Sequence, residues 1–163
     1  MRLLAIDPGP TESAGVEMYP DGAVGWHAKL PNDDMLGWID GGYATHLAIE
    51  MVASYGMPVG ADVFETVFWA GRFAERWEHT PEASRVTPAT LVFRRDVKLH
   101  LCASPRANDA NIRQALIDRY GPGKQKAVGV KATPGPLYGL TSDRWAALGV
   151  AVTAMDTRLQ VAA

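Results

Sequence analysis

The chain begins with an apolar run that ends in an aspartate, a proline and a glycine, Arg2-Leu3-Leu4-Ala5-Ile6-Asp7-Pro8-Gly9. A continuous apolar segment that stops at Pro and Gly is typical of a buried central β-strand. Asp7 is then expected at the exposed tip of that strand, where metal-dependent phosphoryl-transfer enzymes hold a ligand. The alternative is a turn aspartate that hydrogen-bonds its own loop. The rest of the sequence has to decide between the two.

The composition of the chain restricts the class of protein to which it can belong. The chain has 163 residues, 47% of them hydrophobic, which favours one domain over residues 1–163 with a core that needs no disulfides. The single cysteine, Cys102, suits a reducing compartment. No apolar run has the length of a membrane span, and Asp7 interrupts the N-terminal stretch too early for a signal peptide. We expect a soluble cytoplasmic protein, in a bacterium or a phage-infected host.

The net charge of −2 hides an uneven distribution of charge along the chain. Residues 1–84 contain thirteen Asp or Glu and four Lys or Arg, whereas residues 85–131 contain ten Lys or Arg and three Asp. The acidic part could gather a divalent cation, and the basic part could follow a phosphate backbone. A solvated charged surface is the alternative for the basic part.

The first half of the chain is predicted to contain a hairpin, a short connection and another strand. The turn signal Pro20-Asp21-Gly22 separates two apolar segments, and a Gly41-Gly42 break precedes a strand that ends on Glu50. A second carboxylate is therefore expected at a strand end. The expected segments are strands at Ala14–Tyr19, Ala23–Leu30 and His46–Ile49, with a loop or short helix around Asn32–Ile39.

The second half of the chain is predicted to be mainly helical. Asn108 caps one helix that Gly121 ends, and Thr141-Ser142 caps a nearly all-apolar helix with Asp143 in its first turn. The segment Gly121–Gly139 is expected to be a long, mobile loop. The other expected elements are a helix from Pro58-Val59-Gly60 to about Trp77, whose apolar stripe could serve the sheet and a partner subunit, a strand at Arg85–Val92 and a short helix at Arg94–Leu101.

These elements predict a mixed α/β sheet with three acidic residues at element boundaries. If the first and fourth strands are parallel neighbours, Asp7 and Glu50 lie within reach of one metal ion, and Asp143 starts the last helix. Such a cluster can bind one or two Mg²⁺ ions, which orient a water and polarise a scissile phosphate. The four histidines show no metal-ligand spacing.

The ordered set of motifs resembles the RuvC-type Holliday junction resolvases, and particularly their phage-type relatives, within the ribonuclease H-like superfamily. The motifs are Ile6-Asp7-Pro8-Gly9, Glu50, Val97-Lys98, Ala107-Asn108-Asp109-Ala110-Asn111-Ile112, and Ser142-Asp143 with Ala146-Ala147-Leu148-Gly149-Val150-Ala151. The resemblance implies a ribonuclease H-like fold. It also implies a homodimeric endonuclease of DNA recombination and repair, which cuts four-way junctions symmetrically with Mg²⁺ or Mn²⁺.

Residue by residue, the resemblance assigns Asp7, Glu50 and Asp143 to metal binding and Lys98 to the vicinity of the scissile phosphate. The chain departs from the family pattern at Leu140, where an acid or a histidine is usual, and at Asp109, where a lysine is usual. One hypothesis is that Asp109 supplies the missing fourth metal ligand. The alternative is a first-turn aspartate that the helix dipole favours.

DNA is expected along the basic part of the chain, and an aromatic residue such as Tyr55 or Phe68 is a candidate for a wedge that opens a junction. The residues expected to contact DNA are Arg94, Arg95, Lys98, Arg106, Lys124, Lys126 and Lys131.

Two other functions stay open. One is a DNA-junction-binding module without catalysis, which Leu140 would suggest. The other is an actin-like sugar kinase or ATPase, with Ile39-Asp40-Gly41-Gly42 as a second phosphate loop, although that architecture needs two such domains.

Overall fold

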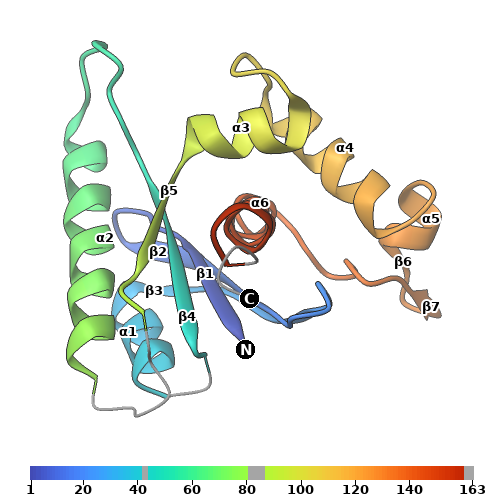
Figure 1. Cartoon of the computed structure of the whole chain (residues 1–163), viewed down its shortest axis with the longest axis horizontal. Coiled ribbons are helices and arrows are strands. Elements are labelled where there is room, and N and C mark those ends of the chain that lie inside the picture. The colour runs from blue at the N-terminus through green and yellow to red at the C-terminus, as the bar shows by residue number, and fades with distance from the viewer. Residues whose placement is uncertain (42–43, 81–86, 160–163) are drawn as a thin grey trace.

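A five-stranded mixed sheet forms the centre of the protein, in a computed structural model that describes residues 1–41, 44–80 and 87–159 (Figure 1). The strand order is β3-β2-β1-β4-β5. The pairs β1–β2 and β2–β3 are antiparallel, whereas β1–β4 and β4–β5 are parallel, so the predicted hairpin and the predicted neighbours are both confirmed. The strands are β1 (Leu3–Asp7), β2 (Glu12–Met18), β3 (Val24–Pro31), β4 (His46–Met51) and β5 (Thr90–Phe93).

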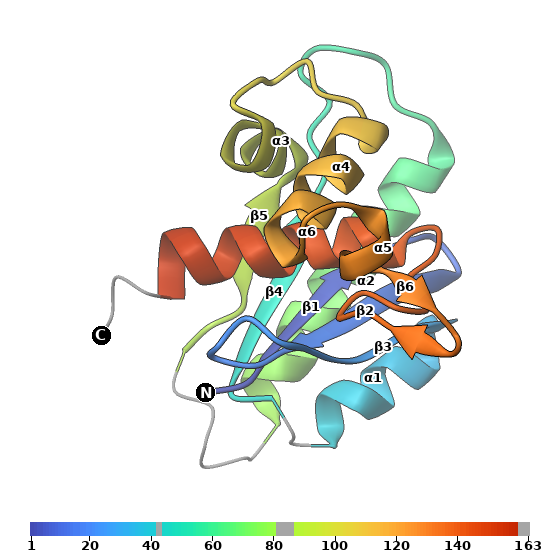
Figure 2. The ribbon, with the colours of Figure 1, turned by 90° about the vertical axis from the view of Figure 1, so that its right-hand side faces the viewer.

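Helices cover both faces of the sheet. The helices α1 and α2 lie on one face, and α6 crosses the other face with α3 and α4 outside it (Figures 1 and 2). The bounds are α1 (Asn32–Asp40), α2 (Ala61–His79), α3 (Arg94–Cys102), α4 (Asp109–Tyr120), α5 (Lys124–Ala127) and α6 (Arg144–Ala154), which continues into the π-helix η1 (Met155–Leu159). In the part of the chain that the structure describes, no helix is long and apolar enough to cross a membrane.

Side-chain alternation along β1 divides the core into two parts. Leu4 and Ile6 pack with α1 and α2, whereas Leu3 and Ala5 pack with α6. Because alternate residues of a strand point to opposite faces, Asp7 belongs to the α6 face of the sheet. The predicted buried strand thus directs its terminal carboxylate toward the last helix.

The helix α6 is enclosed by the sheet, α3 and α4. Every residue of it from Ala147 to Ala154 is buried, as the all-apolar sequence predicts. Gly149 permits the close approach of α3, since a Cβ there would lie 3.1 Å from Val97 Cγ1. The start of α6 is therefore held firmly against the sheet.

Several predicted boundaries were wrong. The segment Gly121–Gly139 is not one long loop: it forms α5 and a small antiparallel pair, β6 (Gly129–Val130) and β7 (Thr133–Pro134), and backbone hydrogen bonds from Gly135 and Leu137 close it. The strand expected at Arg85–Val92 begins only at Thr90, and residues 85–86 lie outside the described residues.

The start of α6 differs from expectation, whereas the start of α4 does not. Asp143 itself is the N-cap of α6, with no capping hydrogen bond from a side chain, while Ser142 takes a positive φ of 48°. Asn108 caps α4 as predicted, in a reciprocal capping box with Asn111.

Candidate active site

The register of β1 against β4 brings Asp7 and Glu50 together. Ile6 pairs with Ile49 in this parallel ladder, so the next position places Asp7 beside Glu50. Glu50 lies within β4 rather than at its end, and the residue is only 6% exposed. Asp7 is itself only partly exposed, in contrast to the exposed tip expected from the sequence. Two carboxylates therefore share a mostly buried position on the α6 face.

This proximity changes the protonation of the pair. Burial raises the pKa of Asp7 to about 9, and the charge of Glu50 and a hydrogen bond with it act in the same direction. Asp143 raises the pKa of Asp7 further, whereas the Arg94 guanidinium lowers it. At neutral pH Asp7 therefore keeps its proton beside Glu50, because a charged carboxylate is costly in a buried position and next to a second one.

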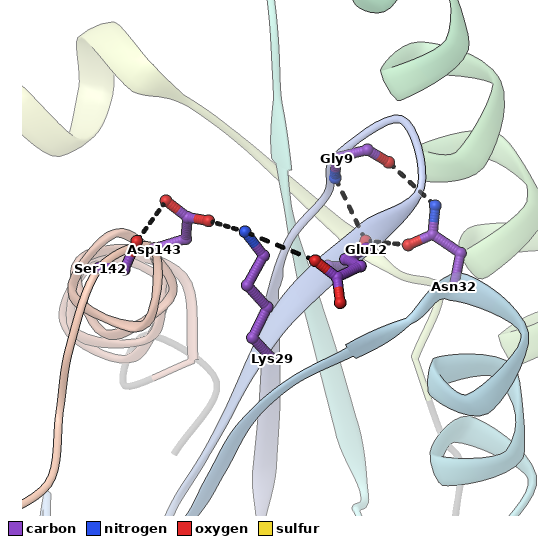
Figure 3. A network of polar contacts seen from close by, with 7 residues as sticks. Gly9, Glu12, Lys29, Asn32, Ser142 and Asp143 are labelled. Atoms are coloured by element: carbon purple, nitrogen blue, oxygen red, sulfur yellow. Dashed lines mark hydrogen bonds and ion pairs between the residues drawn. The ribbon is translucent and has the colours of Figure 1, made fainter.

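A single row of residues across the sheet carries the site. Asp7 pairs with Ala14 of β2, and Ala14 pairs with Lys29 of β3. Residues directly opposite each other in a sheet point to the same face, so Lys29 also faces α6. Its Nζ lies 2.6 Å from Asp143 Oδ2 and 4.0 Å from Glu12 Oε2, as Figure 3 shows. Lys29 thus connects the far side of the sheet with the start of α6.

Arg94 gives the acid pair a second basic neighbour. Arg94 is the first residue of α3. Its Nη1 lies 3.4 Å from Glu50 Oε1, and its Nη2 donates a hydrogen bond to Asp109 Oδ1. Nη1 is buried and makes no hydrogen bond. Asp109 has a side chain that is 86% exposed, and it is not among the charges that shift the pKa of Asp7. The four predicted acids therefore occupy two settings, an adjacent pair in which Asp7 is protonated and two carboxylates in ion pairs.

The loop after Asp7 is fixed by a closed set of hydrogen bonds. Ser13 Oγ accepts from Gly9 N at 3.2 Å and donates to Asn32 Oδ1 at 2.6 Å, and Asn32 Nδ2 donates to the Gly9 carbonyl at 2.9 Å (Figure 3). Ser13 and Asn32 are both buried. A Cβ on Gly9 would lie 2.3 Å from the Glu12 carbonyl oxygen, so the loop needs glycine there.

The predicted basic residues lie on the outer helices. Lys98 follows Arg94 by four residues on α3, so both lie on one side of that helix. Arg94 turns inward to Glu50, and the remaining predicted DNA contacts are exposed: Arg95, Arg106, Lys124, Lys126 and Lys131. Leu140 is buried in the core, and its carbonyl accepts a hydrogen bond from Trp145 Nε1 at 3.1 Å.

Comparison with known proteins shows what this arrangement resembles. No protein-family model matches the chain, and no curated protein matches its sequence. Among solved structures, it aligns with Thermus thermophilus RuvC in complex with a Holliday junction substrate over 98% of this chain and 96% of that one, with a TM-score of 0.61 at 16% identity. A second Thermus thermophilus RuvC structure aligns over 98% of this chain and 97% of that one, with a TM-score of 0.60 at 16% identity. The fold is that of RuvC. The predicted ribonuclease H-like fold is thereby confirmed.

Within this RuvC fold, the side chains of Asp7, Glu50 and Asp143 have the chemistry of ligands to a divalent cation. Carboxylate oxygens are the ligands that Mg²⁺ and Mn²⁺ prefer. Here Asp7 is protonated beside Glu50 because its pKa is raised, and Lys29 neutralises the charge of Asp143 in an ion pair. Each of these carboxylates thus already binds positive charge. In this arrangement, residues 1–41, 44–80 and 87–159 contain no group of three His, Cys, Asp or Glu side chains that could hold a metal ion.

Sequence reasoning missed four residues of this site. Lys29, Ser13 and Asn32 were not selected, and Arg94 was expected to contact DNA rather than Glu50. A polar residue in an apolar strand was the available signal for Ser13 and Lys29. No local pattern marks an ion pair between residues as far apart as Lys29 and Asp143.

Proposed function

We propose that this protein is a metal-dependent endonuclease that cuts branched DNA, with the four-way junction as its substrate and paired symmetric cuts as its product. One observation carries this proposal: Asp7 and Glu50 lie side by side on β1 and β4, close enough to Asp143 for its charge to act on Asp7, on the face of a RuvC fold that α6 covers. Buried carboxyl groups of like charge are costly, and sites that bind charged ligands are where proteins accept that cost.

The acid pair and Asp143 have the role of metal ligands in this proposal. Asp7, Glu50 and Asp143 would hold Mg²⁺ or Mn²⁺, which supplies an activated water and neutralises charge on the scissile phosphate. Ser13 and Asn32 keep the loop after Asp7 in place, so the direction of its carboxylate is set before any ligand binds. Asp109 is a weaker candidate for a metal ligand, because it pairs with the same Arg94 guanidinium that lies against Glu50 and its side chain is exposed.

Basic residues on α3 and beyond it would bind the phosphate backbone. Lys98 would contact a non-bridging oxygen of the scissile phosphate, a role that its place on the same side of α3 as Arg94 supports. The exposed residues Arg95, Arg106, Lys124, Lys126 and Lys131 extend this positive surface. Such contacts make DNA binding weaken steeply with salt.

A homodimer would provide two cuts at symmetric positions. The helix α2 supplies a surface for it, because Phe64 and Phe68 are 66% and 64% exposed, while Phe73 and Trp77 of the same helix are buried. Tyr55 and Met57, just before α2, are exposed as well. Two-fold symmetry would then place two acid pairs on two strands of like polarity.

The experiment that tests the function compares substrates and variants. Wild type, Asp7→Asn and Asp33→Asn would each be incubated with a synthetic four-way junction, a replication fork and a linear duplex, with Mg²⁺ or with EDTA. Asp33 is the matched control, since it is an exposed acid in the first turn of α1. We expect wild type and Asp33→Asn to cut the junction in Mg²⁺ alone, and Asp7→Asn to cut at least about 10³-fold more slowly.

Other outcomes would support other functions. Equal cutting of the linear duplex would contradict junction selectivity, and cutting by Asp7→Asn would contradict the role of the acid pair. A junction that is bound but never cut would favour the binding module, a function to which the ion pairs of Asp143 and Asp109 give some support.

The kinase or ATPase has less support. Ile39 and Asp40 are the last residues of α1, not a loop, and Asp40 pairs with Arg76 at 3.3 Å, while Gly42 lies outside the described residues. ATP turnover without DNA would nevertheless restore this alternative.

A further inference from the structure

A cavity of about 460 Å³ opens beside Asp143, between α4 and the start of α6. Its charged walls are Arg94, Asp109 and Asp143, which belong to the candidate active site, and Arg113, which does not. Its apolar walls are Ile112 and Trp145, with the alanines next to them. The volume is within the range of pockets that bind small organic groups. A strand of DNA at the acid pair would pass the mouth of this cavity.

Arg113 is held in an unusual setting. Its Cζ lies 4.8 Å from the centre of the Trp145 ring, a distance typical of a guanidinium stacked on an aromatic face. The ring is only slightly exposed, and its Nε1 is bound to the Leu140 carbonyl. The platform under Arg113 is therefore rigid, which lowers the entropy that the side chain loses when it binds a ligand.

Within the described part of the chain, Arg113 has no acidic partner, in contrast to Arg94 and Arg119. Arg94 is paired with Glu50 and Asp109, and Arg119, on the same helix as Arg113, is paired with Asp156 at 2.6 Å. Among the residues that the structure describes, no carboxylate forms an ion pair with Arg113. Stacking occupies one face of the guanidinium and leaves the N–H groups on its edge available, and these match the geometry of a phosphate.

We propose that this cavity binds the nucleotide next to the cut phosphate, with Arg113 donating to that nucleotide's phosphate and the apolar wall contacting its sugar. The inference rests on the proposed function, because it needs a DNA strand at Asp7, Glu50 and Asp143. It adds a phosphate-binding residue outside the basic set predicted from the sequence. A phosphodiester fits better than a neutral base, since the free N–H edge has no other anion to bind and Arg94 already neutralises Asp109.

The test measures binding without metal, so that it does not depend on cleavage. Full-length wild type, Arg113→Gln, Arg113→Lys and Arg76→Gln would bind a fluorescent four-way junction in EDTA across a series of KCl concentrations. Arg76 is the control, because it is an arginine of α2, at the opposite face of the sheet, where it pairs with Asp40 at 3.3 Å. Melting temperatures would confirm that the variants are folded.

We expect Arg113→Gln to weaken junction binding about 5–10-fold and to lower the slope of log affinity against log salt by about one. Arg113→Lys should keep the slope and lose part of the affinity, and Arg76→Gln should change neither. Replacing one phosphate beside the expected cut with a methylphosphonate should lower the affinity of wild type for the junction by a similar factor. The same change should have no further effect on Arg113→Gln.

Contrary results would separate the two proposals. The role of Arg113 would be overturned if Arg113→Gln kept the affinity and the salt slope of wild type. It would also be overturned if every methylphosphonate lowered the affinity of Arg113→Gln as much as that of wild type, even if wild type cuts junctions. If removal of the neighbouring base, in a junction with an abasic nucleotide, lowers the affinity of wild type but not of Arg113→Gln, then Arg113 recognises the base and not the phosphate. Absence of any cutting by wild type would contradict the proposed nuclease while leaving the binding result interpretable.

Discussion

Lys29 Nζ lies 2.6 Å from Asp143 Oδ2, although the two residues are 114 positions apart in the sequence. The contact joins β3, at one edge of the sheet, with the start of α6. The hydrogen bond with Asp143 is the main reason why the pKa of Lys29 is raised. A positive charge thus already occupies the position beside a proposed metal ligand.

Lys29→Met should strengthen metal binding. A cation that competes for Asp143 is removed, so the Kd for Mn²⁺ should fall about 3–10-fold at low salt, as expected for two partly exposed charges. Isothermal titration calorimetry measures this directly. Arg76→Met is the control, because it breaks the ion pair with Asp40 and should leave the Kd unchanged. An equal or weaker affinity in Lys29→Met would show that Lys29 does not compete with metal.

Asp7→Asn should stabilise the metal-free protein. The amide keeps the shape of the side chain, and it does not need the proton that Asp7 must take up on folding at neutral pH because burial, and then the charge of Glu50, raise its pKa. We expect the melting temperature in EDTA to rise by about 2–4 °C, which corresponds to about 1 kcal/mol for a chain of this size. Asp33→Asn, at an exposed position, should leave it unchanged. A lower melting temperature for Asp7→Asn would mean that the acid pair is not strained.

The stability of the metal-free protein should depend on pH through Asp7. Its pKa rises from an ordinary 3.8 to about 9 in the folded protein, so the folded state binds the proton more tightly than the unfolded state. The free energy of unfolding should therefore fall as pH rises between these two values. Urea denaturation in EDTA at pH 6 and pH 8.5 would measure the loss. Asp7→Asn should show a smaller loss, and equal slopes in the two proteins would contradict the raised pKa of Asp7.

Asn32→Ala should destabilise the fold and disturb the loop after Asp7. It leaves Ser13 Oγ without its acceptor and the Gly9 carbonyl without its donor, in a buried position. The expected cost is about 1–3 kcal/mol, measured by urea denaturation. Gln114→Ala removes an exposed hydrogen bond to Asp118 and should cost less than about 0.5 kcal/mol. Similar costs for the two variants would show that the network contributes little.

Charges on the exposed side of α2 should prevent self-association. Phe64→Glu with Phe68→Glu places two charges on side chains that do not contribute to the buried core of the monomer. We expect light scattering after gel filtration to give a dimer for wild type and a folded monomer for the double variant. A monomeric wild type would contradict the proposed homodimer, and a dimeric double variant would move the interface to another surface.

The sequence predicted the acid pair but not the residues around it, and a β-bulge explains part of the difference. Asp7 and Glu50 follow from apolar strands and simple alternation, which a sequence displays directly. The register between β2 and β3 shifts by one residue between Val16 and Met18, and only that shift pairs Lys29 with Ala14. Without it Lys29 would point to the opposite face, because a one-residue slip exchanges the faces of a strand.

Other differences have similar physical origins. The caps of α4 were predicted because Asn108 and Gly121 act on their own helix. In contrast, β6 and β7 are two residues each, and the segment is closed by backbone hydrogen bonds from Gly135 to Val128 and from Leu137 to Ala127, for which residue spacing provides no signal. Arg94 turns toward Glu50 because β5 leads directly into α3, a geometry that its place in a basic segment does not indicate.

The row of residues that crosses the sheet through Ala14, Asp7 and Glu50 has a consequence for how this protein can diversify. Its acids lie on central strands whose neighbours on both sides restrict any movement. Arg113 and Lys98 lie instead on helices at the periphery, where exposed positions tolerate substitution. If the proposed function holds, libraries that vary the exposed positions of α3 and α4 should change which DNA shapes are bound, while the geometry of the acid pair stays constant.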